Sequence, residues 1–182
     1  MSEETLIRQC SPTRAGMKTG TLFSTHYTDE NELMDDLRGF NRRLASKGLS
    51  LIPMRCRDQK ALLYLYRPKK LAGDLEHKQA RAILDENGYP QSPGLCLSLL
   101  RRKLLENADF PHEIGLFLGY PPEDVSGFIK CGARACKCTG CWKVYGDETQ
   151  AKRTFAKYRK CTEVYCAQWA AGKSIERLTV TV

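Results

Sequence analysis

The chain has 182 residues, of which 42% are hydrophobic and 27% charged, and these ordinary globular values exclude wholesale disorder. No apolar run approaches the roughly 20 residues that a membrane-spanning helix needs, and the polar, acidic start MSEETLIRQC is unlike a secretory signal. We therefore expect a cytoplasmic protein forming a single domain over residues 1–182. Its nine cysteines, an odd number, fit poorly with full disulfide pairing, so we expect reduced thiols.

The net charge of +8 is concentrated in the C-terminal third. Residues 1–127 hold 18 Lys and Arg against 17 Asp and Glu, whereas residues 128–182 hold 11 against 4. Such a field attracts phosphates, nucleic acid or an acidic protein, although a solvated basic face would have the same composition.

The first elements along the chain are two helices with a strand between them. A short amphipathic helix over Glu3–Cys10 should end at Ser11-Pro12, because proline lacks the amide hydrogen that continues a helix. The run TGTLFST (19–25) predicts a strand. Residues 29–47 carry apolar side chains at helical spacing and predict the second helix.

A hairpin and two helices follow. The runs LSLIPMR and KALLYLYR predict paired strands, with Pro53 favouring an edge position. One continuous helix is expected over residues 70–87. Ser92-Pro93 is a typical start for another helix, which should reach Glu106.

The last third predicts short helices, a strand and one long helix. The runs DFPHEIGLFLG and PPEDVSGFIK each predict a compact helix, and WKVY (142–145) predicts a strand. Asp147 should cap a helix over residues 148–171, and the alternating tail SIERLTVTV predicts a final strand. The sum is an α+β fold, with helices packed on a small, mostly antiparallel sheet.

Four thiols lie close together in the loop 131–141, with the sequence CGARACKCTGC. Zinc takes four thiolates tetrahedrally, and a CxxC pair with an intervening glycine directs both sulfurs at one ion. Cys138 and Cys141 form such a pair, while Cys131 and Cys136 are less regularly spaced. The spacing therefore favours zinc or iron over an iron–sulfur cluster, whose usual cysteine order is different. A surface loop with reduced thiols is the plain alternative.

Two other groups of residues suggest different chemistry. An enzyme pocket could use Cys10 as nucleophile or His112 as base, with Lys18 and Glu113 beside them. A basic adaptor could bind nucleic acid or an acidic protein through the C-terminal helix. The cations that it would use lie off the apolar stripe of that helix: Lys152, Arg153, Lys157, Arg159 and Lys160.

The runs CSPTRAGMKTGTLF, FPHEIGLFLGYPPEDVSGFI and WKVY followed by AKRTFAKYRKCTEVY are similar to the bacterial domain-of-unknown-function family 3793. The resemblance covers nearly the whole chain and is most specific over Phe110–Val125. It points to Cys10, Lys18, Phe110–Val125 and Trp142–Tyr145, and less clearly to the clustered thiols. It implies a protein of anaerobic Firmicutes-type bacteria, with flavodoxin-type or iron-uptake proteins as partners.

Together these patterns lead to one main hypothesis. We expect a thiol-rich protein that binds a metal or an iron-type cofactor and acts in metal or redox homeostasis. The ligands would come from the loop 131–141, and Cys10 or His112 could join them. The enzyme and the basic adaptor remain as alternatives.

Overall fold

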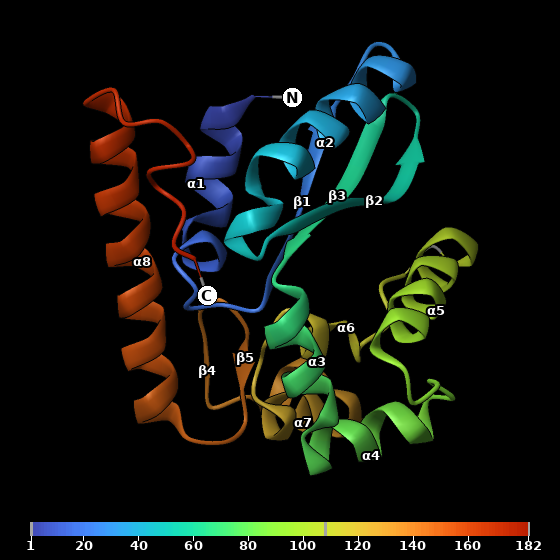
Figure 1. Cartoon of the computed structure of the whole chain (residues 1–182). Coiled ribbons are helices and arrows are strands. Elements are labelled where there is room, and N and C mark those ends of the chain that lie inside the picture. Colours follow the sequence, from blue (N-terminus) through green and yellow to red (C-terminus); the bar gives the residue numbers. More distant parts are fainter. Residues whose placement is uncertain (1, 108, 182) are drawn as a thin grey trace. The chain divides into compact units, whose positions relative to one another are not determined.

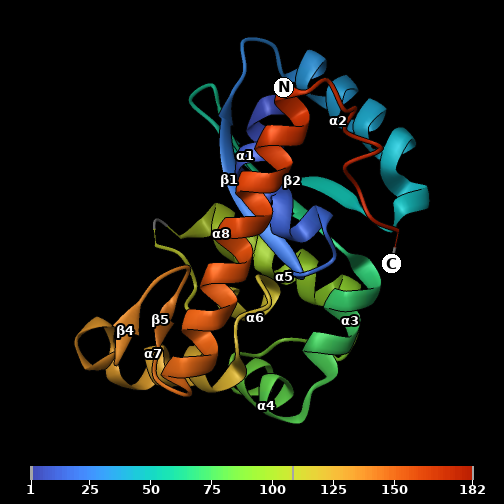
Figure 2. The same ribbon diagram turned by 90° about the vertical axis from the view of Figure 1, so that its left-hand side faces the viewer.

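The structure is a computed structural model that describes residues 2–107 and 109–181. It is an α+β fold with helices packed on a small antiparallel sheet, as predicted (Figures 1 and 2). Its residues group by their contacts into two compact units. The first comprises the described residues up to 69 and from 158 onward, and the second residues 70–157. The prediction of a single domain stays a prediction.

The sheet of the first unit pairs three described strands antiparallel in the order β1–β3–β2. They are β1 (Gly20–His26), β2 (Ser50–Arg57) and β3 (Lys60–Tyr66). Strands β2 and β3 form the predicted hairpin, and its turn residues Asp58 and Gln59 both have the positive φ of a type I′ turn. Pro53 lies on the edge strand β2, as predicted, beside a shift in the pairing register.

Two helices, α1 (Glu3–Arg14) and α2 (Glu30–Leu44), pack on this sheet, and a 3₁₀ turn at Ala45–Lys47 extends α2. The helices, the strands and the C-terminal tail all contribute side chains to one core. It includes Leu6, Ile7, Cys10, Phe23, Leu33, Leu37, Phe40, Leu44, Leu51, Leu63, Leu65, Ile175 and Leu178. Burial of this apolar surface holds the first unit together.

Helix α1 continues through Pro12 to Arg14, so the predicted end at Ser11-Pro12 is wrong. Proline removes one hydrogen bond of the helix ladder. The last turn nevertheless stays helical because Thr13 and Arg14 are fully buried and bonded to other segments. Tertiary packing outweighs the local signal here.

Two arginines with almost no exposed surface, Arg14 and Arg67, join distant segments of the first unit. Arg67 donates from Nε to Thr13 O and from Nη1 to Lys47 O, at the C-terminal ends of α1 and of the 3₁₀ turn. Its Nη2 donates to Arg14 O and to Val180 O. Carbonyls at helix C-termini carry partial negative charge, so they compensate a buried guanidinium that has no carboxylate partner among the described residues.

The C-terminal tail forms turns over its described residues, so the predicted final strand is wrong. Arg14 donates from Nη2 to Ile175 O and to Thr179 Oγ1, and Arg67 donates from Nη2 to Val180 O. The tail carbonyls thus accept from arginine side chains instead of from a neighbouring strand. Ile175 and Leu178 are buried in the core, which fixes the path of the tail.

The second unit is built from short helices and a two-stranded hairpin. Its elements are α3 (Pro68–Glu76), α4 (Lys78–Glu86), α5 (Pro93–Glu106), α6 (Ile114–Phe117), α7 (Pro122–Cys131), a 3₁₀ turn (Ala133–Ala135), β4 (Cys138–Thr139) and β5 (Lys143–Val144). Helix α5 starts at Pro93 and ends at Glu106, as predicted, and the WKVY strand is confirmed only over Lys143–Val144.

The single helix predicted over residues 70–87 is divided at His77, whose backbone is extended. Leu75 of α3 and Ala80 of α4 are both buried although they are five residues apart. A straight helix would point them about 140° apart, so one helix could not bury both against the same neighbours. The break at His77 lets each short helix turn its own apolar face inward.

Helix α8 (Glu148–Ala170) is continuous and contributes residues to both units. Asp147 caps it as predicted, because its Oδ1 accepts from Gln150 N at 2.9 Å. Tyr165 and Trp169 on its apolar stripe pack against the core of the first unit. None of the helices in the described ranges is both long and apolar enough to cross a membrane.

Candidate functional site

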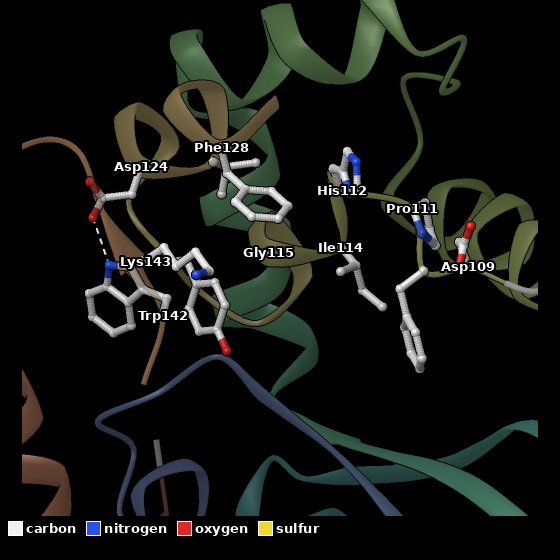
Figure 3. A pocket seen from close by; sticks show the side chains of 12 residues that line it. Asp109, Pro111, His112, Ile114, Gly115, Asp124, Phe128, Trp142 and Lys143 are labelled. Atoms are coloured by element: carbon white, nitrogen blue, oxygen red, sulfur yellow. Dashed lines mark hydrogen bonds between the residues drawn. The ribbon is translucent and has the colours of Figure 1, made fainter. Parts of the chain in front are cut away.

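The second unit contains a cavity of about 680 Å³ with a mostly apolar wall (Figure 3). Aromatic and aliphatic side chains form much of that wall, namely Phe110, Ile114, Tyr120, Val125, Phe128 and Trp142. Four polar side chains also reach it: Asp109, His112, Asp124 and Lys143. A mostly apolar cavity of this size with a few polar groups is typical of small-molecule sites.

Two short helices and the turn between them shape one side of the cavity. Gly115 lies in α6, and a Cβ placed there would be only 2.8 Å from Val125 Cγ2 and 3.0 Å from Tyr120 Cδ2. The missing side chain therefore lets the Tyr120 ring and α7 approach α6 closely. The sequence run Phe110–Val125 is thus a packing unit that carries its aromatic side chains into the wall.

Asp124 connects α7 to the hairpin that forms the other side. This buried carboxylate accepts from Trp142 Nε1 at 2.6 Å, drawn as a dashed line in Figure 3, and from the backbone N–H groups of Tyr145 and Gly146 at 2.7 Å each. Three donors and its place in the first turn of α7 compensate the buried charge. Asp124 therefore fixes Trp142 in the wall.

The aromatic rings around the cavity support one another. Trp142 stacks on Tyr120 with ring centroids 5.0 Å apart and meets the edge of Phe155 at 4.5 Å. His112 packs edge-to-face on Phe128 at 4.9 Å. Burial, and then the charge of the nearby Cys141 thiol, raises the pKa of Tyr120 to about 12, so its phenol is neutral at physiological pH. The rings form a rigid wall suited to a flat ligand.

The sequence of this chain places it in a known family. The sequence profile described as "Protein of unknown function (DUF3793)" matches residues 6–179. The chain belongs to this family. No curated protein and no solved structure matches it.

The four clustered thiols of this DUF3793 protein lie on different elements. Cys131 ends α7, Cys136 follows the 3₁₀ turn, Cys138 begins β4, and Cys141 lies in the turn of the β4–β5 hairpin. In the described part of the chain, no three or more Cys, His, Asp or Glu side chains are grouped so as to hold a metal ion. The structure does not bring the thiols together as a ligand set, and metal binding stays a prediction.

The thiols instead border two tyrosines. Partial desolvation, and then the charges of Cys136 and Cys131, raises the pKa of Tyr145, so these two thiols lie near one phenol. The charge of Cys141 likewise raises the pKa of Tyr120, a wall residue of the cavity, so Cys141 lies near that phenol. The cysteine-rich loop is therefore next to the cavity, although no cysteine lines it.

The predicted enzyme residues fall into two groups. Cys10 and Lys18 belong to the first unit, and His112 and Glu113 to the second. Cys10 has no exposed surface, and burial raises the pKa of its thiol to about 12, which leaves it protonated and unsuited to nucleophilic attack. Glu113 is buried and accepts from Lys103 Nζ at 2.6 Å and from the Tyr89 hydroxyl at 3.0 Å. Its carboxylate therefore serves the packing of the second unit.

The predicted basic face is exposed on α8. It consists of Lys152, Arg153, Lys157, Arg159 and Lys160. Lys152 pairs with Glu148 at 2.6 Å and Lys160 with Glu163 at 3.7 Å, while the other three form no ion pair with a described residue. Exposed pairs of this kind are weak, so the helix remains electropositive. Binding of nucleic acid or an acidic protein stays a prediction.

The cavity itself is not predicted from the sequence. Tyr120, Phe128, Trp142 and Lys143 were not predicted as site residues, although all but Phe128 belong to the runs Phe110–Val125 and Trp142–Tyr145 to which the family resemblance points. The available signal was the density of aromatic residues in the runs 110–128 and 142–145. Spacing alone could not show that these two runs face one cavity.

Proposed function

We propose that this protein binds a flat, largely apolar small molecule in the cavity of its second unit. The observation that carries the proposal is a cavity of about 680 Å³ whose aromatic wall is held by the three hydrogen bonds of Asp124. Flat ligands gain from stacking on such rings as well as from burial of apolar surface.

The polar groups around the cavity favour binding over catalysis. A general base needs a partner that orients it, and the His112 imidazole forms no hydrogen bond with any described residue. The Asp124 carboxylate is occupied by three N–H donors. The arrangement therefore supports recognition, since the described residues of the wall show no pair of groups hydrogen-bonded to each other so as to transfer a proton.

The test uses the tryptophan in the wall. The chain has two tryptophans, so the variant Trp169→Phe leaves Trp142 as the sole one. We expect the neutral aromatic probe N-phenyl-1-naphthylamine to bind this variant saturably and to quench Trp142 by energy transfer. Absence of saturable binding would contradict the proposal.

A matched pair of variants assigns the binding to the cavity. Ile114→Arg places a charge in the wall, whereas Leu105→Arg makes the same change at an exposed apolar position of α5 outside the wall. We expect the probe to be lost from the first variant and kept by the second. A co-purified ligand, detected by mass spectrometry after denaturation, should follow the same pattern. Equal probe binding by both variants would exclude this cavity as the site.

A further inference from the structure

The ammonium group of Lys143 is the cation at the wall of the cavity. Lys143 belongs to β5 and follows Trp142, and its side chain lines the cavity (Figure 3). It is half-buried, and it forms no ion pair with a described residue. An amine at a half-buried, mostly apolar wall is less screened by water, so its attraction for an opposite charge is stronger than at an open surface.

The acidic groups at the same wall do not cancel this charge. The Asp124 carboxylate is buried and receives three N–H donors, and its Oδ2 faces the Trp142 indole. Asp109 is exposed, so solvent and salt screen it. His112 packs on Phe128 and adds no negative charge. Asp124 is therefore engaged by other donors, and the Lys143 ammonium is available to pair with an anion at this wall.

The segment around Lys143 strengthens the same field. Residues 128–157, which include the hairpin, hold seven Lys and Arg against two Asp and Glu. Clustered charge of one sign raises the local concentration of oppositely charged ligands. The other six cations are exposed and screened by salt, so they favour the approach of an anion only at low ionic strength, whereas the half-buried Lys143 lines the cavity where it can pair with one.

We propose that the ligand is an aromatic anion, whose flat ring lies against the aromatic wall and whose carboxylate, sulfonate or phosphate pairs with Lys143. This inference rests on the proposed function, since it names the class of ligand for the same cavity. A charge-assisted hydrogen bond donated by the partly buried ammonium to the anionic oxygen of the ligand adds affinity that a neutral ring of the same shape cannot gain.

The experiment compares two probes that differ by one charged group. 1-Anilinonaphthalene-8-sulfonate is N-phenyl-1-naphthylamine with an added sulfonate, so only the former can pair with Lys143. We expect Lys143→Gln to weaken the sulfonate probe about ten-fold and to leave the neutral probe unchanged. Lys143→Arg should restore the affinity. Lys130→Gln removes the same charge from an exposed position of α7 outside the wall, so it should leave the neutral probe unchanged and weaken the sulfonate probe much less than Lys143→Gln does.

The outcomes separate this inference from the proposed function. If both probes bind in the cavity and Lys143→Gln affects them equally, the anion assignment is overturned while the binding function stands. Tighter binding of the cationic dye thioflavin T than of the sulfonate probe, at the same cavity, would also overturn it. Failure of every probe to bind refutes both proposals. Competition by 1-naphthoate and by 1-naphthyl phosphate then distinguishes a carboxylate ligand from a phosphate one.

Discussion

Replacing Asp124 with alanine removes the acceptor of one buried and two partly buried hydrogen bonds and leaves three N–H groups without that partner. Each unpaired buried donor costs about 1–3 kcal/mol. The Tyr145 and Gly146 amides can regain water when the hairpin relaxes, so we expect Asp124→Ala to lower the unfolding free energy of the second unit by about 3–5 kcal/mol in total.

Asparagine at this position gives an intermediate case. Its side-chain oxygen still accepts from the two backbone N–H groups, but its amide group faces the Trp142 indole N–H, so one bond is replaced by donor–donor repulsion. We expect Asp124→Asn to lose about 2 kcal/mol. The order of stability should therefore be parent, Asp124→Asn, then Asp124→Ala.

Urea unfolding of these variants in the Trp169→Phe background measures the effect, because Trp142 is then the sole tryptophan and reports on the second unit. Asp147→Ala is the control, since it removes one exposed helix cap and should cost about 1 kcal/mol. If Asp124→Ala loses no more than this control, Asp124 does not hold the hairpin against α7. The same variant should lose N-phenyl-1-naphthylamine binding because the wall is no longer fixed.

Two further predictions concern side chains whose pKa is raised by burial. Under native conditions a thiol reagent should modify the exposed Cys131 and Cys141 first and leave Cys10 unmodified, because Cys10 is buried and its pKa is about 12. Peptide mapping measures the rate of labelling at each cysteine. Labelling of Cys10 as fast as that of Cys141 would contradict this prediction. The pKa of Tyr120 is about 12 when folded and about 10 when unfolded, so its contribution to stability is complete below pH 10 and is lost as pH rises towards 12. Between pH 10 and pH 12 the parent should therefore lose about 2–3 kcal/mol more unfolding free energy than Tyr120→Phe, which has no phenol to ionise. Equal losses in the two proteins would refute the raised pKa of Tyr120.

Local signals in the sequence predicted those elements whose ends depend on neighbouring residues. Asp147 at the start of α8 and Pro93 at the start of α5 act within one turn, so the sequence alone was sufficient. The hairpin of β2 and β3 was predicted for the same reason. The local rule failed at Pro12, where packing of the last turn of α1 outweighs the proline signal.

Features that join distant segments could not be predicted. The Arg67 guanidinium donates hydrogen bonds to four backbone carbonyls, which lie at the end of α1, in the 3₁₀ turn and in the C-terminal tail. Nothing near Arg67 in the sequence indicates these bonds. The cavity likewise needs the Asp124–Trp142 bond to bring two runs together. The clustered thiols gave the strongest pattern in the sequence, yet proximity along the chain did not place them around a common point.

The hydrogen bond from Arg67 to the Val180 carbonyl joins two segments of the first unit that are synthesised at different times, and this affects the order of folding during synthesis. The first unit is interrupted in sequence by residues 70–157, so its core cannot be completed until Ile175 and Leu178 have left the ribosome. The second unit is one uninterrupted stretch that ends at Lys157, which is synthesised before Ile175 and Leu178. A nascent chain that ends at residue 157 therefore already carries every residue of the cavity, while Arg14 and Arg67 still lack their partners in the tail.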